Sequence, residues 1–164
     1  MESYFFHINI HENIDKNIVL EHIRQNFNLR PNYTKIKRKI IFNKVIYENN
    51  RFILDDTLII EAENIDNKVV VSIEGCFANY QPNLKKSYEV YKIIKSKNYN
   101  VVLSVGNHKV QEKGLIGFER FCSWLKQIFE NKYNNFERLY GKLNITVLPH
   151  EFYDYIKRNK SILK

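Results

Sequence analysis

In the stretch "RFILDDTLIIEAENIDNKVVVSIEGC", residues 51–76, three apolar segments are separated by two short polar turns. The segments cover residues 51–54, 57–63 and 68–74 and are rich in Ile, Val and Leu. "DD" at 55–56 and "NIDN" at 64–67 contain the residue types that favour tight turns. A parallel crossover needs a dozen or more residues, so strands joined by such short turns pair antiparallel. The stretch therefore predicts an antiparallel meander.

The residues before this meander also favour strands. Residues 3–10 alternate between apolar and polar side chains, as a half-buried strand does. Asp15 is placed to cap a helix over roughly 15–28. Residues 35–47 have strand character, and "ENNR" at 48–51 supplies a turn before the meander. The first half of the chain is thus predicted to be mostly sheet.

The second half is predicted to be mostly helical. We expect helices over 83–97, over 118–140 and from Pro149 onward, strands over 100–105 and 142–148, and a segment without clear periodicity at 106–117. The pattern over 118–140 is the strongest, with Gly141 as its C-terminal cap. Its apolar stripe consists of Phe118, Cys122, Leu125, Phe129, Phe136 and Tyr140. The first four of these are expected to be buried together.

Strands that come mainly first and helices that come mainly later are typical of the α+β class. A chain of 164 residues is close to the usual size of one domain. We therefore predict a single domain over residues 1–164, with a mainly antiparallel sheet and helices packed on one face.

Composition limits the functional classes. The chain carries a net charge of +8, which favours encounters with nucleic acid or with an acidic protein. No apolar run approaches the roughly 20 residues that span a bilayer, so no membrane partner is expected. The two cysteines, Cys76 and Cys122, are too few for a disulfide framework. Without a recognisable signal sequence, reduced thiols and a cytoplasmic location are the expectation.

Cys76 raises the question of nucleophilic catalysis. If strand 68–74, helix 83–97 and strand 100–105 form a βαβ unit, the loops after both strands lie at one end of the sheet. Cys76 and Asn79 would then approach His108, and a Cys–His pair with an orienting Asn is a known catalytic constellation. However, a cysteine at the end of an apolar strand is more often a small buried residue. We predict that Cys76 is at least partly buried, reduced and unreactive.

Other catalytic patterns are absent from the sequence. Of the five histidines, His7 and His11 are four residues apart, but on a predicted strand rather than a helix and with His11 near the turn, and none has the companion cysteine pair of a zinc site. Asp55 and Asp56, followed by Glu61 and Glu63, bear some likeness to a metal-dependent nuclease, but "EAE" lacks the lysine that such a site needs. We therefore predict no catalytic residues, no metal and no cofactor, and keep a hydrolase with an unrecognised site as the least favoured alternative.

The densest basic run is "KIKRKI", residues 35–40. Alternation on a strand would place Lys35, Lys37 and Lys39 on one face. Such charges protect a sheet edge from pairing with other chains. They also suit a stripe that follows phosphates, so a nucleic-acid-binding protein with a basic surface is the main alternative function.

The layout of residues 70–158 resembles that of small immunity proteins, which bacteria pair with polymorphic or contact-dependent growth inhibition toxins. The resemblance is carried by the strand-ending "EGCF" at 74–77, the long aromatic helix, and "YGKLNITVLPHEFYDYIK" at 140–157. It implies a protein that is not an enzyme and that neutralises one cognate toxin by binding it directly. Because this chain is basic, the toxin is expected to have an acidic contact face, unless the contact surface here is locally acidic.

Loops at the end of a rigid sheet are usual carriers of recognition, so segments 75–82 and 106–114 are the predicted partner-binding regions. Tyr80 offers an aromatic anchor, and His108, Lys109 and Lys113 offer polar and cationic contacts. These four residues are the predicted binding site.

Overall fold

The computed structural model describes residues 2–33 and 37–159, and their side chains except those of residues 37–41 and 46–48. The chain forms a sheet of seven strands in the order β2-β5-β6-β7-β1-β8-β9. Every neighbouring pair in this sheet is antiparallel. The strands are β1 (Ser3–Ile10), β2 (Leu29–Pro31), β5 (Arg51–Leu54), β6 (Leu58–Ile65), β7 (Lys68–Cys76), β8 (Val101–Val105) and β9 (His108–Val110). The predicted meander is confirmed as β5, β6 and β7.

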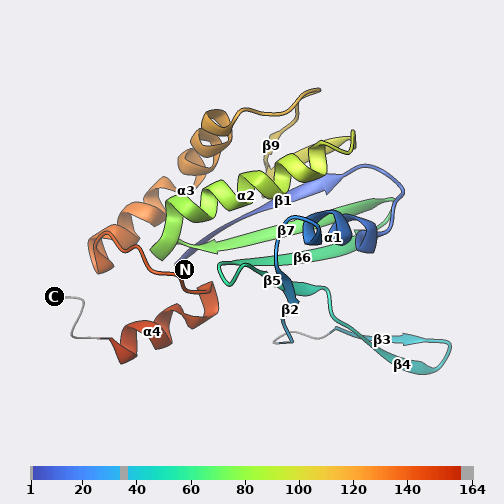
Figure 1. Ribbon diagram of the computed structural model, residues 1–164, viewed down its shortest axis with the longest axis horizontal. Coiled ribbons are helices and arrows are strands. Elements are labelled where there is room, and N and C mark those ends of the chain that lie inside the picture. The colour runs from blue at the N-terminus through green and yellow to red at the C-terminus, as the bar shows by residue number, and fades with distance from the viewer. Residues whose placement is uncertain (1, 34–36, 160–164) are drawn as a thin grey trace.

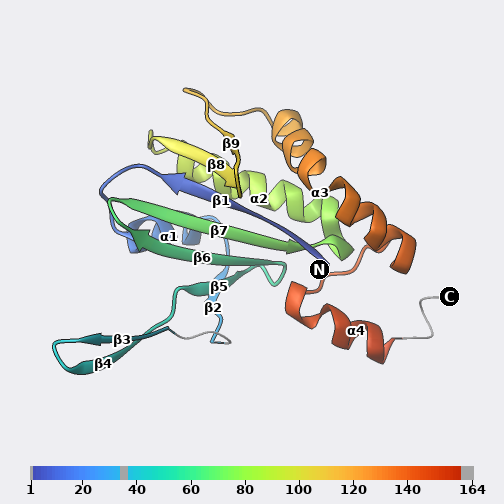
Figure 2. The ribbon, with the colours of Figure 1, turned by 180° about the vertical axis from the view of Figure 1, so that it is seen from behind.

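Three helices cover one face of this sheet: α1 (Lys16–Arg24), α2 (Tyr80–Lys95) and α3 (Phe118–Tyr140). Figure 1 shows α1 and α2 in front of the strands, and Figure 2 shows β1, β7 and β6 nearest the viewer from behind. On β1, the side chains of Tyr4, Phe6 and Ile8 are buried against the helices, while those alternating with them are half-buried. The α+β class with helices on one face is therefore confirmed.

The helix signals in the sequence correspond to real caps. The Asp15 side chain accepts a hydrogen bond from the backbone N–H of Asn17 at 2.7 Å, as the capping prediction required. Gly141 ends α3 with a φ of +73°, a conformation that glycine adopts without strain. Helix α1 is shorter than predicted, because it ends at Arg24. Helix α2 begins earlier than predicted, directly after a 3₁₀ turn, η1 (Phe77–Asn79).

Helix α3 spans the predicted residues, but one predicted core residue is wrong. Cys122, Leu125 and Phe129 are buried, whereas Phe118 is 41% exposed. Phe121 takes the expected place of Phe118 and packs edge-on against Phe6 of β1, with ring centroids 5.4 Å apart. Phe118 lies in the first turn of α3, where the helix has only begun to approach the sheet.

The strand predicted over 142–148 is not formed. In its place, residues 142–148 run past η1 and make one backbone hydrogen bond there, from Ile145 N to Ala78 O at 3.1 Å. Leu148 then packs on Ile53 and Ile59, at one end of the face that the helices leave free. A second 3₁₀ turn, η2 (Pro149–Glu151), and helix α4 (Phe152–Arg158) complete the described chain. The alternating pattern was misleading, because a strand also needs a neighbour with which to pair its backbone.

The predicted strand over 35–47 is instead a hairpin of β3 (Lys37–Ile41) and β4 (Lys44–Glu48). Its two-residue turn, Phe42–Asn43, has positive φ angles of 47° and 61°, as a type I′ turn requires. The hairpin forms its own two-stranded sheet and projects from the body of the molecule (Figures 1 and 2). Phe42 at its tip is 96% exposed. The predicted basic face of residues 35–40 lies outside the described residues at 35–36 and the described side chains at 37–40.

Candidate functional site

The structure does not assemble the Cys76–His108 pair. Strands β7 and β8 run parallel, as predicted, but β1 lies between them and β9 lies beyond β8. Cys76 on β7 and His108 on β9 are therefore three strand spacings apart, or about 14 Å at ~4.8 Å for each spacing. Cys76 and Asn79 are both buried, whereas His108 is exposed. These three side chains cannot act together in this arrangement.

Burial also suppresses the reactivity of Cys76. It raises the pKa of this thiol to about 11, and the backbone hydrogen bond from Ala78 only partly offsets the shift. Because the thiolate is the reactive form, about one thiol in ten thousand is ionised at pH 7. We therefore expect iodoacetamide to label Cys76 far more slowly at pH 7 than in urea-unfolded protein.

The measurement is mass spectrometry of labelled peptides over time, with buried Cys122 as the internal comparison. Rapid labelling of native protein that is lost in Cys76→Ser would contradict the expectation.

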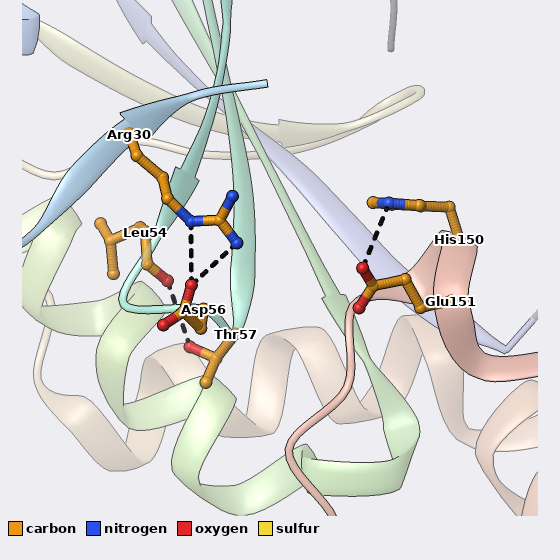
Figure 3. A network of polar contacts seen from close by, with 6 residues as sticks. All are labelled: Arg30, Leu54, Asp56, Thr57, His150 and Glu151. Atoms are coloured by element: carbon orange, nitrogen blue, oxygen red, sulfur yellow. Dashed lines mark hydrogen bonds and ion pairs between the residues drawn. The ribbon is translucent and has the colours of Figure 1, made fainter. Parts of the chain in front are cut away.

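The carboxylates that suggested a nuclease have structural partners. Asp55 and Asp56 form the β5–β6 turn, with φ angles of 46° and 57°. Arg30 of β2 reaches Asp56 with two guanidinium nitrogens at 2.9 Å (Figure 3). Lys86 of α2 lies 3.5 Å from Asp55. The interpretation of this dipeptide as a turn is confirmed, and no group of three potential metal ligands occurs among residues 2–33 and 37–159 whose side chains are described.

The predicted binding residues do not form one surface. Tyr80 lies in the first turn of α2 and is only 4% exposed. Its ring packs against those of Tyr4, Phe77 and Tyr133, with centroids 4.7 to 5.4 Å apart. Helix α2 begins at this residue and turns the ring into the core, so little of the predicted aromatic anchor lies at the surface.

The other three predicted residues are exposed but separated. His108 and Lys109 lie on edge strand β9, where alternation places them on opposite faces of the sheet. Lys113 follows β9 and lines a hollow of 290 Å³ with Lys92 and Lys95, near the end of α2. Of the four residues, only Lys109 belongs to the helix-free face of the sheet.

That face carries a continuous row of polar residues. Each member is the register partner of the next, across six neighbouring strands from β9 to β5. In order, the residues of this polar row are Lys109, Ser104, His7, Ser72, Glu61 and Arg51. An antiparallel sheet can expose one face to water, and across this face the row runs from exposed Lys109 through buried Ser104 to four half-buried residues.

Hydrogen bonds hold the centre of the polar row in place. His7 Nδ1 and Ser72 Oγ share a hydrogen bond of 2.8 Å, and Asn9 Nδ2 donates to Ser104 Oγ at 2.9 Å. Partial burial lowers the pKa of His7, so its imidazole is neutral at pH 7. These hydrogen bonds fix the orientation of the side chains that they join.

The β5–β7 side of the row is fixed by ion pairs. Arg51 lies 3.5 Å from Glu61 and 3.6 Å from Glu74, and its side chain is only 13% exposed. Ser3 Oγ donates a 2.9 Å hydrogen bond to the Glu74 carboxylate. One guanidinium thus faces two carboxylates. The Arg51–Glu61–Glu74 group therefore carries one net negative charge, on a chain whose net charge is +8.

Sequence reasoning missed this face because its members come from six strands. The alternation in residues 3–10 indicates that His7 and Asn9 share a face. Nothing in the sequence shows that Ser72, Glu61 and Arg51 stand beside them, since that depends on the register of three separate strand pairs.

Comparisons of this chain with protein-family models, curated proteins and solved structures find no match. Across the described residues, no helix has the length and apolar character that crossing a membrane requires.

Proposed function

We propose that this protein binds a partner protein and neutralises it, as an immunity protein neutralises its cognate toxin in the cytoplasm. The observation that carries the proposal is the polar row, a mostly half-buried line of charged and hydrogen-bonding groups that neighbours in the sheet orient. Binding through such a surface loses little side-chain entropy, because the groups are already ordered. Fixed charges also select partners, since a like charge opposite them is costly.

The local charge indicates the kind of partner surface. The sequence led us to expect an acidic contact face on the toxin. The Arg51–Glu61–Glu74 group supports the other possibility, a locally acidic surface here that suits a basic contact face on the toxin. Lys109, at the far end of the row, adds one cation that would meet a carboxylate.

The test is co-expression with a candidate toxin encoded by a neighbouring gene, scored as survival of host cells. We expect the wild-type protein to protect and Val70→Arg to lose protection. Val70 is half-buried on the helix-free face beside Asn9, so the substitution places a long cation on the surface and leaves the hydrogen bonds of the row intact. Glu74→Lys, which reverses a charge of the group, should lose protection as well.

Glu130→Lys is the matched control, because it makes the same charge change at an exposed position of α3. Thermal unfolding of each purified variant verifies the fold. If the wild-type protein fails to protect, the immunity function is wrong. If Val70→Arg and Glu74→Lys protect as well as Glu130→Lys, the function stands and the helix-free face is not the contact surface.

Nucleic-acid binding has one observation in its favour, the projecting hairpin, whose sequence includes Lys37, Arg38, Lys39 and Lys44. The paired carboxylates of the helix-free face repel phosphates, so protein binding is better supported. Salt-dependent binding to random RNA or DNA would favour this second function.

A further inference from the structure

The β3–β4 hairpin leaves a strand edge without a partner. The hairpin is a separate two-stranded sheet, so among the described strands β4 pairs only with β3. In both Figure 1 and Figure 2, β4 lies on the side of the hairpin away from the main sheet. A two-stranded hairpin is at best marginally stable in water, and a further strand stabilises it.

The two strands of the hairpin differ in how strongly their charges protect an exposed strand edge from pairing. Strand β3, "KRKII", has three consecutive cations, the kind of charge that prevents edge-to-edge pairing. Strand β4, "KVIYE", has a cation at its first position, an anion at its last and three apolar residues between them. When two copies of β4 are aligned antiparallel, the lysine of each copy therefore stands opposite the glutamate of the other.

The turn determines which backbone groups of β4 face outward. In a two-residue hairpin the residues flanking the turn, Ile41 and Lys44, form a hydrogen-bonded pair. The backbone groups of Val45 and Tyr47 therefore point away from β3, and a new strand would bond to these. In an antiparallel pairing centred on Ile46, Val45 of one copy stands opposite Tyr47 of the other, so both outward-facing residues are paired.

From this edge we infer that β4 pairs with β4 of a second copy of this chain, forming a two-fold symmetric dimer with a four-stranded sheet across the interface. The register centred on Ile46 places Lys44 opposite Glu48 twice, Val45 opposite Tyr47 twice, and Ile46 opposite itself. Opposite charges and aromatic–β-branched pairs are favourable cross-strand neighbours. The interface is isologous, so it closes at two copies.

Pairing of one five-residue strand buries less than the ~1,200 Å² of a standard interface, so the dimer is weak and concentration-dependent. This inference does not depend on the proposed function, because it uses a different surface.

The first test removes a backbone donor. Val45→Pro deletes an outward-facing N–H that the hairpin itself does not use, and proline is tolerated at such edge positions. In sedimentation equilibrium from about 10 μM to about 1 mM, a range that brackets weak complexes, the wild type should dimerise and Val45→Pro should remain monomeric. Circular dichroism of the variant verifies the fold. A monomeric wild type at every concentration overturns the inference, as does a Val45→Pro variant that dimerises normally.

The second test uses charge. Lys44→Glu and Glu48→Lys each create two like-charged pairs across the interface, so each should weaken self-association by about tenfold or more. An equimolar mixture of the two variants should dimerise like the wild type, because every facing pair in the mixed dimer is then of opposite charge. Lys39→Glu, an equal charge change on β3, is the control and should leave the dimer unchanged. If the mixture stays monomeric, or if Lys39→Glu weakens the dimer as strongly as Lys44→Glu, the β4 pairing is wrong.

Discussion

Replacing Phe129 by Ala is expected to lower the free energy of unfolding by about 3–5 kcal/mol, the usual range for a core aromatic residue. Phe129 is 2% exposed on α3. Its ring meets those of Tyr4 and Phe5 of β1 edge-on, and that of Phe77 of η1 in the same way, with centroids 5.7 to 6.4 Å apart. Truncation therefore opens a cavity where α3, β1 and the start of α2 meet. Urea denaturation followed by circular dichroism measures the loss.

Phe118→Ala is the matched control, since it removes the same side chain from the same helix. Phe118 is 41% exposed, and its described ring contact is with Tyr88, at 5.2 Å between centroids. We expect it to lose about 0.5–1.5 kcal/mol, the range for a single aromatic pair. An equal loss of unfolding free energy in the two variants would contradict the structure, in which α3 buries Phe129 and leaves Phe118 partly exposed.

Gly75→Ala is expected to destabilise the fold by about 1–3 kcal/mol, because it overpacks the core. A Cβ atom at residue 75 would come within 2.7 Å of the Tyr4 ring on the facing strand β1. Tyr4 cannot easily retreat, since it is fully buried and its hydroxyl shares a 2.8 Å hydrogen bond with Ser87 of α2. The backbone of Gly75 is not in the left-handed region, so the cost is one of space alone.

A double-mutant cycle separates this steric cause from other effects. In a Tyr4→Leu background, where the ring is gone, Gly75→Ala should cost less than about 0.5 kcal/mol, the level of an independent site. Gly114→Ala is the second control, because nothing lies within 4 Å of a Cβ there. A full loss from Gly75→Ala in the Tyr4→Leu background would mean that the close approach to Tyr4 is not the cause.

Gly75 also shows how far the sequence could be interpreted. The sequence "EGCF" predicts the end of a strand, and β7 does end at Cys76. The sequence does not show why residue 75 has to be glycine. Tyr4 lies 71 residues earlier in the chain and approaches Gly75 only through the β1–β7 register.

The local patterns of the chain were sufficient for the α+β class, the meander, helix α3 and the burial of Cys76. Periodicity, turn residues and caps act within about 20 residues, so each pattern is complete within one segment. The same reasoning failed at Phe118, because periodicity reports the direction of a helix face but not where along its length the helix meets the sheet. It failed at 142–148, because alternation does not provide a strand with a partner.

Only the tertiary structure decided that the polar row is assembled and that the β3–β4 hairpin forms a sheet of its own. Ser72, Glu61 and Arg51 join His7 through hydrogen-bond registers between strands far apart in the chain, and a shift of one residue would turn each side chain to the opposite face. Tyr80 became part of the core because α2 begins three residues before the predicted helix. The open edge of β4 exists because the main sheet ends at β2 and β9, which leaves the hairpin to pair with itself. Such long-range pairing depends on the packing of the whole chain, and no local pattern specifies it.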